Sequence, residues 1–433
     1  MTYPYNSIIQ SYLTDGYVTV QTDFDEAFHR SIYDRIEEIF ESNGNPGNDI
    51  YPQIPGLGDV FCHPRVRRAL TAILGPDYIM HPHRHCHLTP PGKEAQINHK
   101  DSYEDDENVR HHRSRWAMAF YYPRDVDEDY GPTAVTPGSQ YYIQSQSLES
   151  LEEKKLCGPA GLVTIVHYDL WHRASPNLTD QNRYMMKFLF CRKKEPVFPS
   201  WNSKNELPDF CKNRSLCEHL WRWNTGQGMA LTNGEEITTA LIDQYRHGSE
   251  PERLDAAYRL GGAGKTDGLL ELLTDDLEAR VEGNLEKPHT NACQIDAIYG
   301  LTAAGGKAVP DLADILSHSD WWMRAVAADA LGDIGRPAVS ATRRLAGALE
   351  DESEWVRRNA VEALGNLNAV DVVDNLGRAL GDESESVRHN AALSILKIGS
   401  FSAGCRKSLT EVLDDSNRYV RALSRILLDT NFS

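Results

Sequence analysis

The chain has 433 residues, of which 40% are hydrophobic, and its formal net charge at pH 7 is −18. This length exceeds what one hydrophobic core usually supports, so we expect two domains. The negative charge would repel nucleic-acid phosphates and anionic membranes from the molecule as a whole, and we therefore expect no nucleic-acid and no membrane partner.

The N-terminal segment and the cysteines predict a soluble, cytoplasmic protein that is not exported. Residues 1–17 contain no basic stretch followed by an apolar one. No run of about 18 apolar residues occurs in the chain. The eight cysteines form no C-x-x-C pair and no dense framework, so we expect reduced thiols, most of them buried.

The first half of the chain shows no repeat and predicts a sheet-rich domain at residues 1–230. Amphipathic helices are expected near residues 26–42 and 64–74. Between Pro and Gly turns lie short β-rich runs, at residues 17–20, 116–122, 162–166 and 184–191. Such runs are typical of an antiparallel barrel or sandwich.

His99 and Asp101 begin a predicted metal site. Side chains alternate between the two faces of an extended segment, so these two residues share one side and the lysine between them points away. A second histidine, His172, follows the run at 162–166, and Arg183 opens the next run. Two histidines and one carboxylate leave open positions on an octahedral metal, as in non-heme Fe(II) oxygenases. Arginine suits a carboxylate, which its forked guanidinium can bind.

Several motifs occur together within residues 5–200. They are YLTDGYVTV at 12–20, H-x-D at 99–101, GPTAVTPGSQ at 131–140, W-H-R-x-x-P-N at 171–177, and Arg183, which follows His172 by 11 residues. In this order they resemble the phytanoyl-CoA dioxygenase-like branch of the Fe(II)/2-oxoglutarate oxygenases. The resemblance implies a double-stranded β-helix, or jelly roll. In it, His99, Asp101 and His172 would be the catalytic iron ligands, and Arg183 would pair with the distal carboxylate of 2-oxoglutarate.

The same resemblance implies a reaction. Fe(II) is the expected cofactor, 2-oxoglutarate and O2 are the expected co-substrates, and ascorbate could serve as reductant. An unactivated C–H bond would be hydroxylated with release of succinate and CO2, although desaturation and ring closure stay open. Asp101 argues against halogenation, since related halogenases have a small residue there. Two departures from the family pattern, Gln140 for a histidine and Leu162 for an aspartate, remove no ligand and bear on loop packing or substrate.

Further residues near these motifs are candidates for binding the co-substrate or substrate. Lys93 and Gln96 lie on the strand that enters H-x-D, where residues of related enzymes reach these molecules, and Thr133 is another candidate. The loop after Asp101 contains a group of basic residues that could hold a carboxylate or phosphate of a small-molecule substrate, or could balance the acidic run before them. Its arginines are Arg110, Arg113 and Arg115.

A run of alternating histidines forms a second cluster, at positions 81, 83, 85 and 87. Alternate positions on one strand would place all four imidazoles on one face, which would suit zinc or copper. The other interpretation is a strand that lines the active-site mouth or packs in the domain. In that case a histidine such as His85 would contact the substrate.

The second half, residues 236–433, is repetitive. Arginines recur every 31 to 33 residues, each followed by an Ala/Leu-rich stretch and a second apolar helix, at positions 324, 357, 388 and 421. With two weaker upstream copies, about five units result. Their pattern resembles HEAT-like repeats of the phycobilisome-lyase type, which implies an all-α solenoid. We expect the repeated Asp and Arg to form salt bridges between repeats and to cap helices.

The role of the repeats stays open. They contain 21 Lys and Arg against 32 Asp and Glu, so a basic partner fits better than DNA. They could recruit a protein whose side chain the first domain hydroxylates, form an interaction scaffold beside an inert barrel, cover the barrel, or mediate self-association. An intact metal triad with Arg183 argues against an inert barrel.

Overall fold

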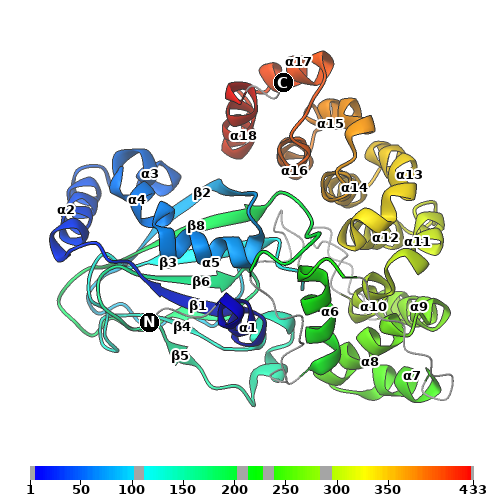
Figure 1. The fold of residues 1–433 in the computed structure, drawn as a ribbon, viewed down its shortest axis with the longest axis horizontal. Helices are drawn as coiled ribbons and strands as arrows, with labels where there is room; N and C mark the ends of the chain where they lie inside the picture. Colours follow the sequence, from blue (N-terminus) through cyan, green and yellow to red (C-terminus); the bar gives the residue numbers. More distant parts are fainter. Residues whose placement is uncertain (1–4, 102–111, 202–212, 228–237, 283–294, 431–433) are drawn as a thin grey trace. The chain divides into compact units, whose positions relative to one another are not determined.

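The computed structural model describes residues 5–101, 112–201, 213–227, 238–282 and 295–430 (Figure 1). The chain divides into two compact units. The first unit comprises Met1–Asp101, Ser114–Arg192 and Pro199–Lys212, and the second comprises Ser102–Arg113, Lys193–Phe198 and Asn213–Ser433. The division falls before the predicted boundary near residue 230, because helix α6 (Arg214–Asn224) packs against helix α8 (Glu250–Gly262) of the second unit.

Two antiparallel sheets form the first unit. The larger sheet has the strand order β1-β6-β3-β8-β2 and the smaller has the order β5-β4-β7. The strands are β1 (Tyr17–Gln21), β2 (Tyr78–Thr89), β3 (Trp116–Tyr121), β4 (Thr133–Val135), β5 (Lys154–Lys155), β6 (Leu162–His167), β7 (His172–Ala174) and β8 (Arg183–Arg192). This arrangement confirms the sheet-rich first domain that the β-rich runs predict.

Helices cover one face of the larger sheet, and α5 lies across its strands in Figure 1. The helices of this unit are α1 (Tyr5–Asp15), α2 (Glu26–Asn43), α3 (Ile50–Gln53), α4 (Gly56–Cys62) and α5 (Pro64–Leu74). Alternate residues of β8, including Phe188 and Phe190, are buried in one apolar cluster with Phe61 and Leu70 of these helices. Burying each large side chain contributes roughly 2 kcal/mol. Since strand side chains alternate, Arg183 and Lys187 face the opposite side of the sheet.

The histidine run lies on β2, where the pairing with β8 is interrupted. A register shift between Met80 and Arg84 interrupts the pairing of β2 with β8, so the strict alternation expected over residues 81–87 is lost. Beyond the shift, Cys86 joins the apolar cluster under the helices, while His85 and His87 pair with Lys187 and Met185 on the other face. Of the four predicted aligned imidazoles, His85 and His87 share a face, while His81 and His83 lie within the register shift, which a pattern of alternating residues does not reveal.

The second unit is helical, which confirms the predicted all-α region. After α6 and α8, its helices are α7 (Thr238–His247), α9 (Thr266–Glu282), α10 (Asp296–Ala304), α11 (Val309–Ile315), α12 (Trp321–Ile334), α13 (Thr342–Gly347), α14 (Glu354–Asn366), α15 (Val373–Ala379), α16 (Glu385–Ile398), α17 (Ala403–Glu411) and α18 (Arg418–Asp429). Figure 1 shows them as consecutive pairs. The first helices of successive repeats, α12, α14, α16 and α18, pack on one another and bury their Ala and Leu side chains.

The repeated arginines link neighbouring repeats. Arg357 pairs with Asp382 of the next repeat at 2.8 Å, and its guanidinium also donates to the backbone carbonyls of Asp351 and Glu352. Equivalent pairs join Arg324 to Asp351 at 2.7 Å and Arg388 to Asp415 at 2.7 Å. Asp382 also accepts from the backbone N–H of Ser384, the residue that precedes α16. These contacts confirm the predicted inter-repeat salt bridges.

One expectation about the cysteines is wrong. Cys62, Cys86, Cys157, Cys191 and Cys405 are free thiols, as expected. Cys217, which is buried on α6, is disulfide-bonded. A single disulfide leaves no repeated spacing in a sequence, so the absence of a framework did not reveal it. Within the described ranges, no helix combines the length and the apolar character needed to span a membrane.

Candidate metal centre

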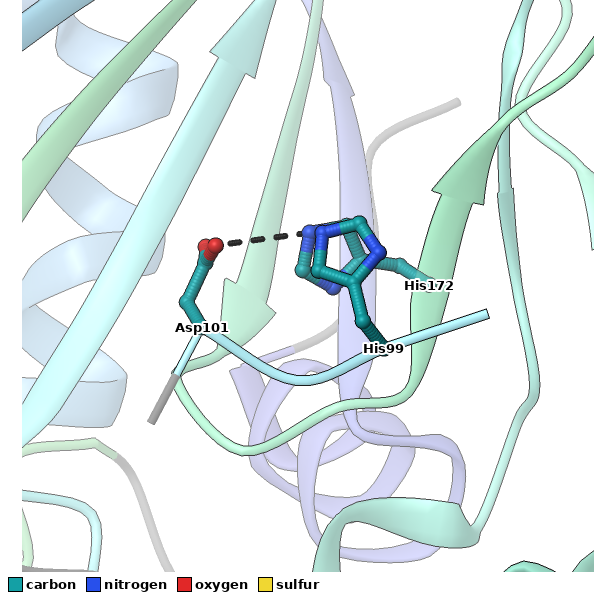
Figure 2. A group of neighbouring side chains, drawn as sticks. All are labelled: His99, Asp101 and His172. Atoms are coloured by element: carbon teal, nitrogen blue, oxygen red, sulfur yellow. Dashed lines mark ion pairs between the residues drawn. The ribbon is translucent and has the colours of Figure 1, made fainter. Parts of the chain in front are cut away.

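A backbone bridge brings the two histidines of the predicted site together. His99 and His172 form an isolated antiparallel bridge, in which each backbone N–H donates to the carbonyl of the other at 2.9 Å. Residues directly opposite in an antiparallel pair project to the same face. The imidazole centroids are accordingly 4.6 Å apart. Asp101, two residues after His99, projects to the same side, and Figure 2 shows all three groups pointing toward one another.

Backbone carbonyls fix the tautomer of both imidazoles. His99 Nδ1 lies 2.9 Å from the carbonyl oxygen of Ile97, and His172 Nδ1 lies 2.9 Å from that of Leu170. A carbonyl can only accept, so both Nδ1 atoms carry a proton, and Nε2 is the nitrogen that each ring can offer as a ligand. Burial also lowers the pKa of His172 to about 4, against the attraction of Asp101. The ring is therefore neutral near pH 7, the state in which histidine binds a metal.

Asp101 is kept ionised by a buried lysine. Its Oδ2 atom accepts from Lys187 Nζ at 2.9 Å and lies 3.7 Å from His172 Nε2 (Figure 2). Burial alone would raise the pKa of Asp101. The positive charge and hydrogen bond of Lys187 are the main effects that outweigh it and hold the pKa of Asp101 well below its ordinary value. The site therefore offers an anionic carboxylate at neutral pH.

The three groups can bind a metal ion together. One potential ligand atom from each of His99, Asp101 and His172 lies within 4.8 Å of the others. No other group of three or more His, Cys, Asp or Glu side chains in the described ranges meets this criterion, and this includes the histidines of β2. Two neutral nitrogens and one anionic oxygen suit Fe(II), and three protein ligands leave coordination positions open.

Arg183, at the start of β8, carries a buried donor without a partner. The residue is 1% exposed, its Nε atom donates to the carbonyl of Gly131 at 2.8 Å, and its guanidinium lies 5.8 Å from the ring centre of Tyr122. One terminal nitrogen, NH1, has no hydrogen-bond partner. A buried guanidinium that lacks an acceptor is energetically unfavourable unless an anion completes it. This donor fits the distal carboxylate that the sequence assigned to Arg183.

Histidines from β2 lie near these groups. His85 and His87 pair in register with Lys187 and Met185, on the sheet face that also carries Arg183. Burial, with a further contribution from Lys187, holds the pKa of His87 well below its usual range, and its Nε2 atom has no hydrogen-bond partner. The imidazoles of His85 and His87 are 4.7 Å apart. This face therefore combines cationic groups with a neutral imidazole.

The secondary candidates lie around this centre in different settings. Thr133 is buried on β4, where its Oγ1 accepts from the Tyr122 hydroxyl at 2.9 Å. Gln96 is exposed and pairs with the backbone of Ala174. The Lys93 side chain is exposed. Their roles toward a co-substrate stay predictions.

Gln140, which stands where the family pattern has a histidine, and Lys100 of the H-x-D motif both make hydrogen bonds within the chain. Lys100 points away from the metal ligands, as expected, and donates to the Gln140 carbonyl at 3.3 Å. The Gln140 side chain donates to the carbonyl of Leu13 at 3.1 Å. It also packs so closely against Gly16 that a Cβ there would lie 2.5 Å from Gln140 Oε1, and the φ of +79° at this position favours glycine as well. Gln140 therefore serves loop packing.

The basic loop does not gather as one substrate-binding group. Arg110 lies outside the described residues. Arg113 belongs to the second unit, where its guanidinium donates to the carbonyl of Asp333 and to His219, 3.2 Å away. Arg115 is 1% exposed and belongs to the first unit. Proximity in the sequence suggested a shared role, but the chain passes from one unit to the other between Arg113 and Arg115.

Sequence reasoning missed Lys187, the residue that contacts Asp101 most closely. A usable signal was present, because Lys187 follows Arg183 by four positions on one strand and therefore shares its face. Tyr122 and His87 were also not assigned. Tyr122 follows β3 directly, and its partners Thr133 and Arg183 come from β4 and β8. Such neighbours cannot be read from local spacing.

Comparisons with known proteins agree with this geometry. Residues 12–185 match the model of the phytanoyl-CoA dioxygenase (PhyH) family, and residues 341–429 match a model of HEAT repeats. A search of curated proteins found no match.

Among solved structures, the chain is similar to the non-heme α-ketoglutarate-dependent carbocyclase SnoK and epimerase SnoN from nogalamycin biosynthesis, and to AviO1 from Streptomyces viridochromogenes. SnoK is 16% identical with a TM-score of 0.38, and the match covers 54% of this chain and 97% of SnoK. For SnoN the values are 15%, 0.38, 44% and 84%, and for AviO1 they are 13%, 0.37, 44% and 96%. The family matches by themselves show that the chain combines a phytanoyl-CoA dioxygenase (PhyH) domain at residues 12–185 with HEAT repeats in its C-terminal region.

Proposed function

We propose that this protein is an Fe(II)- and 2-oxoglutarate-dependent oxygenase that hydroxylates a C–H bond of a small anionic molecule. The observation that carries the proposal is the convergence of two imidazole Nε2 atoms and one ionised carboxylate in a PhyH domain. With Fe(II) and 2-oxoglutarate bound, the site would supply O2-dependent oxidation of the C–H bond, coupled to conversion of 2-oxoglutarate into succinate and CO2.

The histidines and Asp101 would hold the metal, and their surroundings would orient them. The carbonyls of Ile97 and Leu170 keep each imidazole in the tautomer that presents Nε2. Lys187 holds the carboxylate of Asp101 at 2.9 Å. Such outer contacts commonly determine metal affinity, because they limit how far each ligand can rotate.

Arg183 would bind the distal carboxylate of 2-oxoglutarate. The carbonyl of Gly131 restrains its Nε atom and leaves the unpartnered NH1 for an anionic acceptor. Thr133 and Tyr122, which are hydrogen-bonded to each other beside this guanidinium, would complete the pocket with hydroxyl groups. Gln96 and Lys93 would contribute from the strand that enters the metal motif. A charge-assisted bond of this kind is roughly twice as strong as a neutral one.

The substrate would bind over the sheet face that carries Lys187 and His85. Lys187 adds positive charge beside the ligands, and His85 and His87 add hydrogen-bonding capacity. This composition supports an anionic group on the substrate, and His85 stays our candidate for contacting it. Desaturation or ring closure would need the same ligands and would differ in how the substrate is held.

The proposal is tested by anaerobic addition of Fe(II) and then 2-oxoglutarate, followed by absorption spectroscopy. We expect a charge-transfer band that needs both additions. The band should be lost in His172→Ala, because a ligand is removed, and weakened in Arg183→Ala, because 2-oxoglutarate loses its carboxylate partner.

Matched controls use the same substitutions at exposed positions. His247→Ala, on α7, and Arg30→Ala, on α2, should leave the band unchanged. Absence of the band in the parent protein would overturn the proposal, as would an unchanged band in His172→Ala.

A further inference from the structure

The second unit contains a cavity of about 940 Å³ whose described lining belongs entirely to that unit. Its walls come from α6, from the end of α10 with the turn Gly305–Lys307, from residues 195–197, and from the 3-10 helix Arg336–Ala341. A Cβ built on Gly305 would meet no atom within 4 Å, so this wall faces open space. Pockets of roughly 300–1,000 Å³ accommodate small organic ligands.

Positive charge is concentrated around this cavity. Arg113, Lys307 and Arg336 line it, against Glu195 as the acidic lining residue. The Glu195 carboxylate accepts from Trp223 Nε1 at 3.0 Å. Lys307 and Arg336 are exposed, and among the described residues neither has an ion-pair partner. This contrasts with residues 236–433 as a whole, where acidic residues outnumber basic ones by 32 to 21.

Two buried donors in the lining lack acceptors. His219 is 3% exposed, and its Nε2 lies 3.2 Å from an Arg113 guanidinium nitrogen that can only donate. The proton must therefore be on Nδ1, which has no partner. Burial, followed by Arg113, lowers the pKa of His219 to about 3, so the ring stays neutral near pH 7. Thr302, 2% exposed, likewise has a hydroxyl without a partner.

The rest of the lining is apolar. Val197 and Val339 are 59% and 58% exposed, which is unusual for valine, and Ile334 and Pro337 line the cavity with them. The residues that line the cavity thus carry hydroxyl, imidazole and cationic donors together with apolar side chains. A ligand that satisfies both parts needs an oxyanion and an apolar body.

We propose that this cavity binds a small organic anion, a carboxylate or phosphate monoester with an apolar body, as a ligand site of the helical unit. His219 Nδ1 and the Thr302 hydroxyl would donate to its oxygens. Lys307 and Arg336 would attract its charge, and Val197 and Val339 would cover its apolar body. Such a site is separate from the metal ligands and would allow a metabolite to bind the repeat region.

The test uses 4-bromobenzoate as the probe and the full-length protein. Isothermal titration calorimetry should detect its binding. Bromine anomalous scattering from soaked crystals should locate it beside Trp223, with the carboxylate toward His219 and Thr302. Arg336→Glu and Lys307→Glu should each weaken binding by roughly threefold to tenfold, because a charge is reversed at a solvent-accessible pair. Phenyl phosphate, titrated in parallel, should compete with 4-bromobenzoate if the site accepts both head groups, and failure to compete restricts the proposal to carboxylates.

Controls separate this site from other cationic surfaces. Arg343→Glu reverses an exposed charge on α13 that does not line the cavity, and it should leave binding unchanged. Thr302→Val removes the hydroxyl at nearly constant volume and should weaken binding, whereas Thr302→Ser should retain it. Arg183→Ala should bind normally, since Arg183 lies in the first unit.

Three results would overturn the proposal. They are no binding of 4-bromobenzoate at millimolar concentration, a bromine peak outside this cavity, and equal weakening by Arg336→Glu and Arg343→Glu. Loss of binding in Arg183→Ala would place the probe in the oxygenase domain instead. None of these results bears on whether the His99, Asp101 and His172 group holds iron.

Discussion

Lys187 and Arg183 share one face of β8, yet of the two only Lys187 has an anionic partner among the described residues. Lys187 is paired with Asp101 at 2.9 Å, whereas Arg183 has a terminal nitrogen with no acceptor. A cation that already has its anion stabilises the fold, and one that lacks it is arranged for a ligand. This difference suits the two residues to different roles. In the proposed function, Lys187 would position a metal ligand and Arg183 would bind the co-substrate.

Replacing Lys187 by Met should reveal this positioning role. The substitution keeps the length of the side chain but leaves the buried Asp101 carboxylate without its cation. The metal-free protein should then lose about 3 kcal/mol of unfolding free energy. Added Mn(II) should stabilise the variant more than the parent, because the metal no longer competes with an ammonium group for Asp101. Urea denaturation with and without Mn(II) measures both effects.

Lys155→Met serves as the matched control for this prediction. Lys155 pairs with Glu128 at 3.5 Å on the surface, where an ion pair contributes at most about 1 kcal/mol. The control should change stability little and should not alter the response to Mn(II). If Lys187→Met and Lys155→Met behave alike, Lys187 does not position Asp101.

At the scale of elements, the repeat unit depends on contacts between one helix pair and the next. Arg357 and Asp382 are 9% and 11% exposed, so their ion pair is largely removed from water. Each guanidinium of this series also binds the backbone carbonyls just before its own helix, as Arg324 does with His318 and Ser319. These inter-repeat ion pairs thus fix both the spacing between repeats and the start of each helix, which is a structural role.

Breaking one of these inter-repeat ion pairs should therefore destabilise the helical unit. Arg357→Met should lower its unfolding free energy by about 3 kcal/mol, because Asp382 remains as a buried charge without a partner. Arg344→Met, which removes an exposed pair with Asp314, should cost less than about 1 kcal/mol. Urea denaturation followed by circular dichroism compares the two. Adding Asp382→Leu to Arg357→Met should restore part of the loss, and equal effects of the two single variants would contradict this account.

For the molecule as a whole, local patterns predicted some features and missed those that depend on distant segments. The alternation around Asp101 and the arginine period of the repeats are local, and they predicted that His99 and Asp101 share a side and that the second half is helical. The β2 bulge, the Lys187 contact and the place of Arg113 in the second unit depend on which strands and loops meet. The path of the chain between the units depends on such contacts too, since residues 193–198 belong to the second unit before the chain remains there from Asn213.

A crystal structure of the full chain, grown anaerobically with Fe(II) and 2-oxoglutarate, tests the central claim most directly. Anomalous scattering at the iron edge should show one metal ion bonded to Nε2 of His99, Nε2 of His172 and a carboxylate oxygen of Asp101. The distal carboxylate of 2-oxoglutarate should accept from the terminal nitrogen of Arg183 that has no partner within the chain. Iron bound elsewhere, or 2-oxoglutarate placed away from Arg183, would contradict the account.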